Sequence, residues 1–211
     1  MSIRVLLTDD HEVVRAGYAR LLESAPGIDV IAEASSGEEA CSEYFNHQPD
    51  VLVMDLTMPG IGGLEACRRI LVRDTKARIL IFSVRENEIM LERALNAGVK
   101  GYISKRSASE VMVDAVQQVA AGEVYIGQEM MSHLVGRKTS AEGGQIKDLT
   151  PREFEVFRLL ADSKSVNEIA GILNISPKTV GHHMTHIKEK LGIGNIAGLT
   201  RLAIRLGITS A

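Results

Sequence analysis

The sequence has only two cysteines in 211 residues, Cys41 and Cys67, and their spacing fits no metal-binding motif. It has no run of about 18 apolar residues, so we expect no membrane-spanning helix. The first residues enter a strand pattern directly, so we expect no signal peptide. No glycine-rich phosphate loop is present, so nothing favours nucleotide binding. Scarce cysteine without an export signal predicts a cytoplasmic protein.

Charge is distributed unequally along the chain. The net charge is −3, and the hydrophobic and charged fractions, 45% and 24%, are ordinary for a globular protein. Residues 1–124 carry 19 acidic and 13 basic side chains, whereas residues 125–211 carry 8 acidic and 11 basic ones. The second part is therefore the better candidate for binding a polyanion.

Five short apolar segments alternate with helical patterns in the first part of the chain. Two of them are almost continuously apolar, as strands buried on both faces are. This alternation predicts an α/β doubly wound, five-stranded parallel sheet with helices on both faces and strand order 2-1-3-4-5. The predicted strands are 3–8, 29–33, 51–54, 79–83 and 101–104, and helices are predicted to begin near Glu12, Gly37, Gly63, Asn87 and Ala108.

Two of these helices begin with the signature of a capping box, in which a hydroxyl and a carboxylate satisfy free amide groups. The pairs are Ser36 with Glu39 and Ser107 with Glu110. Residues 123–134 are compatible with either a sixth helix or an ordered extension. We expect residues 1–124 to form one domain and residues 125–148 to form an extension followed by a flexible linker.

The sequence pattern of the rest of the chain, residues 149–211, predicts an all-α domain of four helices. Its helices have clear start signals: Thr150 with Glu153, Ser165 with Glu168, and Ser176 before a proline. The last helix is predicted from about residue 196 to residue 206. The turn between the second and third helices is short, which is typical of a helix-turn-helix.

Three carboxylates follow predicted strands. Asp9 and Asp10 follow the first strand and Asp55 follows the third. Strands one and three are neighbours in the predicted order, so these side chains should converge at the carboxyl edge of the sheet. Clustered carboxylates repel one another unless a cation lies among them. Oxygen ligands alone favour Mg²⁺ (or Mn²⁺), and Asp55 could then act as a nucleophile toward a phosphoryl group.

Three further side chains suit this chemistry. Ser83 ends the fourth strand and Lys105 follows the fifth, where a hydroxyl and an ammonium could contact phosphoryl oxygens. Tyr102 lies three residues before Lys105. Each of these residues taken alone has an ordinary structural explanation, such as a turn, a surface lysine or a core tyrosine. The combination at the correct strand ends is what favours a functional interpretation.

Asp9-Asp10, Asp55 before Met58-Pro59-Gly60, Ser83, and Tyr102 to Lys105 resemble the signature of receiver domains of two-component response regulators. The resemblance covers about residues 1–122 and implies a flavodoxin-like fold. It implies that Asp55 accepts a phosphoryl group from a sensor histidine kinase, with Mg²⁺ held by Asp10, Asp55 and the Thr57 backbone carbonyl, and with Asp9 acting through water. Lys105 would bind the phosphoryl group, and Ser83 would move so that Tyr102 turns inward. Many receivers have proline where Arg106 stands.

In the third helix of the second domain, Val180, Met184, Ile187 and Leu191 are spaced to face the core. Polar and basic side chains occupy or flank the other face, where they could contact the phosphates and base edges of double-stranded DNA. The candidate DNA-binding residues are Lys178, Thr179, His182, His183, Thr185, His186, Lys188 and Lys190.

This part resembles the LuxR-type helix-turn-helix over about residues 149–207. The likeness is carried by residues 149–153, 168–170 and 176–180, by His183, and by Lys190-Leu191. With the receiver signature, it identifies the NarL/FixJ type of response regulator, similar to GacA-like regulators. The resemblance implies a homodimer, formed on phosphorylation. Gly181 stands where the family commonly has lysine, so the recognition helix is less basic than usual.

Two other functions stay open at this stage. A phosphotransferase or phosphatase enzyme would need a substrate pocket and a general acid, and the sequence shows neither, so we expect no enzyme. A relay in which the helical domain binds protein rather than DNA is compatible with the weakly basic recognition helix. The histidine cluster is either a nucleic-acid contact or ordinary polar surface, and the lack of a fourth ligand disfavours zinc.

Overall fold

A computed structural model describes residues 2–84, 87–135 and 146–209. The chain divides into two compact units, Met1–Val135 and Gly136–Ala211. Most of the predicted linker, residues 136–145, lies outside the described residues, and the domain boundary at residue 124 stays a prediction. No helix among the described residues is both long and apolar enough to cross a membrane.

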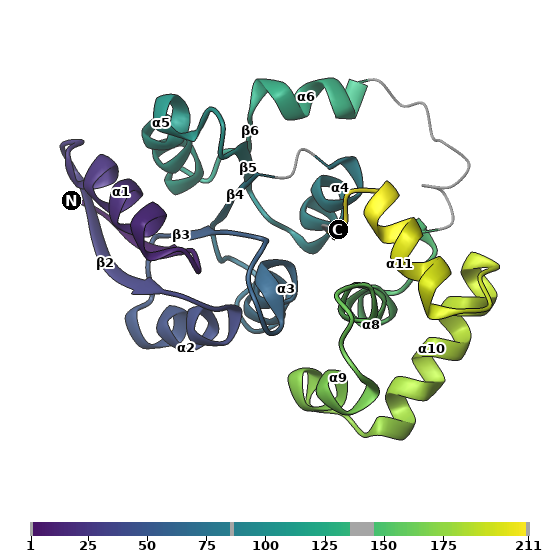
Figure 1. Cartoon of the computed structure of the whole chain (residues 1–211). Helices are drawn as coiled ribbons and strands as arrows, with labels where there is room; N and C mark the ends of the chain where they lie inside the picture. The colour runs from purple at the N-terminus through teal and green to yellow at the C-terminus, as the bar shows by residue number, and fades with distance from the viewer. Residues whose placement is uncertain (1, 85–86, 136–145, 210–211) are drawn as a thin grey trace. The chain divides into compact units, whose positions relative to one another are not determined.

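The first unit is built on a parallel sheet in the order β2-β1-β3-β4-β5-β6 (Figure 1). All five predicted strands are present in the predicted order, but a sixth strand pairs with β5 through Gly101–Tyr125 and Tyr102–Ile126. The five-stranded prediction was therefore wrong by one strand, because two residues are too few to show a strand period. The strands are β1 (Ile3–Thr8), β2 (Ile28–Ala34), β3 (Val51–Met54), β4 (Ile79–Ser83), β5 (Gly101–Ser104) and β6 (Tyr125–Ile126).

Helices cover both faces of the sheet. Helices α1 and α5 share a core with the sheet, in which Leu22 and Met112 pack with Val53 and Phe82. Helices α2, α3 and α4 follow one another on the other face (Figure 1). Strands covered on both sides have no solvent face, which explains their unbroken apolar sequence. The helices are α1 (Glu12–Glu23), α2 (Gly37–His47), α3 (Gly62–Arg73), α4 (Glu88–Ala97), α5 (Ala108–Ala120) and α6 (Gln128–Val135).

The two predicted capping boxes of this unit form only in part. Ser36 accepts a hydrogen bond from the Glu39 amide at 3.2 Å, while the Glu39 carboxylate accepts from the Ser35 amide at 2.7 Å. Ser107 makes no side-chain cap, so the predicted Ser107–Glu110 box was wrong. An N-cap residue is normally extended, whereas Ser107 has helical torsions (φ −103°, ψ −1°), which turns its hydroxyl away from the helix start.

The second unit contains α8 (Pro151–Ala161), α9 (Val166–Leu173), α10 (Pro177–Leu191) and α11 (Ile196–Arg205). Both predicted capping boxes at Thr150 and Ser165 are confirmed, as is the Ser176 cap of α10. The expected α10 core face is buried at three of its four positions, and Met184 is only half-buried. The largest apolar side chains of this core are Phe154, Phe157, Ile169, Val180, Ile187, Leu191, Leu199 and Leu202.

Candidate functional site

The pairing of β1 with β3 brings Asp9 and Asp55 to the same edge of the sheet. Thr8 and Met54 are register partners, and the Asp55 amide donates to the Thr8 carbonyl at 3.0 Å. Both aspartates are almost fully buried, at 0% and 1% exposure. Buried carboxylates require partners, because an isolated charge is poorly solvated in the interior.

Lys105 supplies the positive partner for both aspartates. Its ammonium Nζ lies 2.5 Å from Asp9 Oδ2 and 2.9 Å from Asp55 Oδ2. Burial raises the pKa of Asp55, and the neighbouring Lys105 only partly offsets this effect. Burial acts to lower the pKa of Lys105, but Asp55 and Asp9 outweigh it, so the pKa of Lys105 is raised and the side chain stays an ammonium.

Asp10 and His11 extend the cluster. Ligand atoms of Asp9, Asp10 and His11 lie within 4.8 Å of one another. Among the described residues, these three form the group of side chains that could hold a metal ion. Asp10 Oδ1 is buried and accepts no hydrogen bond from the described residues, although His11 Nδ1 lies 2.8 Å away. A buried oxygen without a donor suits a cation. Sequence reasoning missed His11, whose only signal was its position after two aspartates.

Asp55 and Thr57 are joined locally. The Thr57 amide donates to Asp55 Oδ1 at 3.2 Å, which fixes the start of the loop after β3. Gly63, at the start of α3, passes so close to this strand end that a Cβ atom there would overlap the Asp55 carbonyl oxygen. Sequence reasoning did not single out Gly63, because its need for glycine arises from a tertiary contact.

Ser83 ends β4, and Tyr102 lies within the neighbouring strand β5, where its register partner is Ile81. Both are fully buried, and the Ser83 carbonyl accepts a hydrogen bond from the Lys105 amide at 2.8 Å. The structure thus brings Ser83 to the same strand edge as Asp55 and Lys105. Tyr102 is already buried in this structure, and its movement with Ser83 stays a prediction.

In the second unit, α10 presents a polar face. Lys178, His182 and Thr185 are exposed, and the rings of His182 and His186 meet with centroids 4.1 Å apart. Thr179 is bound to the helix cap, since its amide donates to Ser176 Oγ at 3.1 Å. His183 is half-buried, and burial, reinforced by the nearby Arg152 charge, lowers its pKa. Lys188 is also half-buried.

Lys190 and His186 are held by a buried carboxylate on α8. Lys190 Nζ lies 2.7 Å from Glu153 Oε2, and His186 Nδ1 lies 3.6 Å from Glu153 Oε1. Burial acts to raise the pKa of Glu153, but the bonds from Lys190 and Thr150 outweigh it and lower this pKa to about 2. Lys190 therefore also links α10 to α8 through its ion pair with Glu153, and His186 lies beside this pair.

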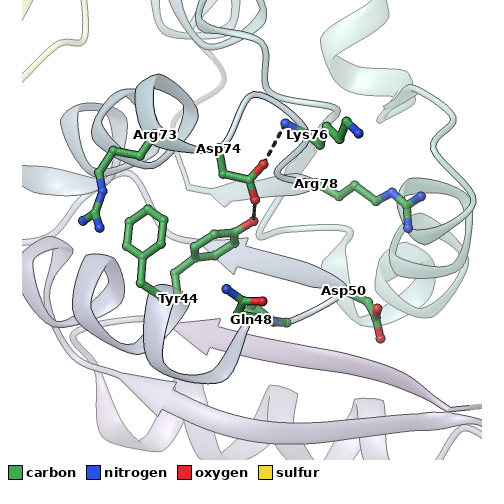
Figure 2. A pocket seen from close by; sticks show the side chains of 9 residues that line it. Tyr44, Gln48, Asp50, Arg73, Asp74, Lys76 and Arg78 are labelled. Carbon is green, nitrogen blue, oxygen red and sulfur yellow. Dashed lines mark hydrogen bonds between the residues drawn. The ribbon is translucent and has the colours of Figure 1, made fainter.

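A hollow of about 470 Å³ lies at the opposite edge of the sheet, where β3 and β4 begin (Figure 2). Its two acidic residues accept hydrogen bonds, Asp74 from the Tyr44 hydroxyl at 2.8 Å and Asp50 from the Arg4 amide at 2.8 Å. Figure 2 shows Arg73 and Arg78 pointing to opposite sides. The cations do not converge, so this hollow lacks the geometry of the aspartate–lysine cluster.

Both units match known families. Residues 5–117 match the response regulator receiver domain, and residues 147–203 match the luxR family of bacterial regulatory proteins. The chain therefore belongs to the two-component response regulators with a receiver domain and a LuxR-type DNA-binding domain.

Similar proteins span nearly the whole chain. The response regulator UvrY of Escherichia coli (strain K12) is 38% identical over 99% of this chain and 97% of its own length. The response regulator GacA of Pseudomonas aeruginosa is 35% identical over 99% of both chains. The structure of RcsB from Salmonella enterica serovar Typhimurium, bound to promoter rprA in the presence of phosphomimetic BeF3−, is 26% identical with a TM-score of 0.73, and the match covers 96% of this chain and 98% of that one.

Proposed function

We propose that Asp55 accepts a phosphoryl group from a phosphohistidine of a sensor kinase and that phosphorylation controls DNA binding by the second unit. The observation that carries the proposal is the buried Asp55 carboxylate held 2.9 Å from the Lys105 ammonium. Attack by an Asp55 oxygen on phosphorus breaks the phosphorus–nitrogen bond to the histidine and forms an acyl phosphate. Lys105 would neutralise charge on the phosphoryl oxygens, and the Ser83 hydroxyl, at the end of β4, would contact them.

We propose Mg²⁺ (or Mn²⁺) as the cofactor. Asp10, Asp55 and the Thr57 backbone carbonyl would hold it, with Asp9 acting through water. Asp10 Oδ1, which is buried and accepts no hydrogen bond from the described residues, supports this assignment, as does the closeness of Asp9 and Asp10. When bound, the metal ion would offset the negative charge of the carboxylates and of the incoming phosphoryl group.

We propose that α10 enters the DNA major groove. Exposed Lys178, His182 and Thr185 would contact DNA directly, with Thr179, His183 and Lys188 beside them. His186 and Lys190 would also contact DNA, although both lie beside Glu153 in this structure. The similarity to RcsB, whose structure was determined bound to promoter rprA, supports DNA binding by this chain. A homodimer formed on phosphorylation and a cytoplasmic location complete the proposal, the latter consistent with two free cysteines.

The test is to incubate the full chain with acetyl phosphate and Mg²⁺, and to measure intact mass and retention of genomic DNA fragments. Wild type should gain one phosphoryl group and bind DNA more tightly, while Asp55→Asn should gain none. An equal mass gain by Asp55→Asn would refute the assignment of Asp55. Phosphorylation without any DNA retention at low salt would favour a protein-binding relay instead.

A further inference from the structure

Lys105 contacts aromatic side chains as well as carboxylates. Its ammonium Nζ lies over the face of the Phe82 ring, 4.7 Å from the ring centroid. Tyr18 of α1 meets the same ring edge-on, with centroids 5.2 Å apart and ring planes at 84°. The Tyr18 hydroxyl also donates to the Lys105 backbone carbonyl at 3.3 Å. Phe82 of β4 thus contacts the ammonium of Lys105, and Tyr18 of α1 contacts its backbone carbonyl.

We infer that Phe82 and Tyr18 are positioning residues that direct the Lys105 ammonium toward the phosphoryl group on Asp55. The inference rests on the proposed phosphorylation of Asp55 and deepens it. Neither aromatic residue touches the reacting atoms; both act through Lys105. Sequence reasoning placed Phe82 in a buried strand and gave Tyr18 no role.

The physical reason lies in the length of the lysine side chain. A lysine has four rotatable side-chain bonds, and holding its ammonium at one point loses much rotamer entropy. The negative face of an aromatic ring attracts a cation, most strongly where water is excluded. The Phe82 side chain has 0% exposure, and the Tyr18 ring packs on it. Its ring is therefore shielded from water and restrained from rotating. The ring therefore offers the ammonium a fixed surface.

The contact between the Lys105 ammonium and the Phe82 ring also persists when the charge around Lys105 changes. Nζ now divides its bonds between Asp9 Oδ2 and Asp55 Oδ2. Once Asp55 carries a phosphoryl group, the ammonium must follow the new oxygens, whereas the Phe82 face and the Tyr18–carbonyl bond stay in place. The aromatic pair thus holds Lys105 near Asp55 in both states.

The test compares Phe82→Leu and Tyr18→Phe with wild type in the full chain. The rate of Asp55 phosphorylation is followed by intact mass against acetyl phosphate concentration, and beryllofluoride affinity by fluorine NMR. Phe82→Leu should lower the second-order rate constant and the beryllofluoride affinity by about five-fold. Tyr18→Phe, which removes one hydroxyl, should lower both by about two-fold. Phe45→Leu and Tyr44→Phe, at the opposite edge, are matched controls that should change neither.

A double-mutant cycle separates positioning from general packing. If Phe82 acts through Lys105, then Phe82→Leu should cost nothing further in a Lys105→Ala background. The same loss in both backgrounds would overturn the inference, as would wild-type rates for Tyr18→Phe with a normally folded chain. Failure of wild type itself to phosphorylate would instead refute the proposed function, so the two failures are distinguishable.

Discussion

Glu153→Gln tests whether one buried charge holds the recognition helix in place. Gln keeps the side-chain acceptor for the Thr150 amide, which Glu153 now binds at 2.8 Å, because glutamine also serves in a capping box. It removes the charge that faces Lys190 at 2.7 Å and His186 at 3.6 Å. The variant therefore separates the contribution of the Lys190–Glu153 ion pair between α8 and α10 from that of the cap.

The magnitude follows from the pKa of Glu153, which is lowered from 4.5 to about 2. This pKa difference corresponds to at most about 3 kcal/mol in the free energy of unfolding at neutral pH. Lys190 is one-third exposed, so solvent screens part of this energy, and we expect a loss of about 1 to 2 kcal/mol. Because the folded pKa is depressed, the stabilisation is complete above pH 4.5 and disappears as the pH falls toward 2.

Hydrogen exchange followed by mass spectrometry measures this effect in the full chain, because it resolves α10 from the first unit. Glu153→Gln should speed α10 exchange about 5- to 30-fold at pH 6, and the difference from wild type should shrink toward pH 3. Glu168→Gln is the matched control, because Glu168 completes the other capping box at Ser165 but is solvated. A pH-independent difference, or an equal effect of the control on α10, would refute the reasoning.

Three further predictions concern single residues. Gly63→Ala should destabilise the first unit by at least about 3 kcal/mol and slow Asp55 phosphorylation, because its Cβ would overlap the Asp55 carbonyl; thermal unfolding and intact mass test this, and a wild-type melting temperature would contradict it. Gly181→Ala should stabilise α10 by about 1 kcal/mol, since nothing lies within 4 Å of the new Cβ, and slower α10 exchange is the measurement; unchanged exchange would count against it. Lys178→Ala should weaken binding to all DNA sequences and reduce the salt slope by about one, whereas a changed sequence preference with the same slope would contradict a phosphate contact.

Local patterns in the sequence determined most of the fold. Buried strands such as 51–54 and 79–83 and the caps at Thr150, Ser165 and Ser176 depend on residues close in sequence, so the sequence predicts them directly. The aspartate–lysine cluster was also predictable, because parallel strands place all their carboxyl ends at one edge. The short strand β6 and the missing Ser107 cap were not, since neither leaves a reliable local pattern.

The tertiary structure alone decided which partners the functional residues have. Lys190 and His186 were predicted to contact DNA from their place on the recognition helix, and the packing of α10 on α8 brought both to Glu153. From the sequence, Phe82 is one apolar residue in a buried strand. The packing of α1, β4 and the end of β5 places its ring under Lys105. Periodicity determines which face of a helix or strand is buried, whereas a contact between distant residues depends on how those faces pack together.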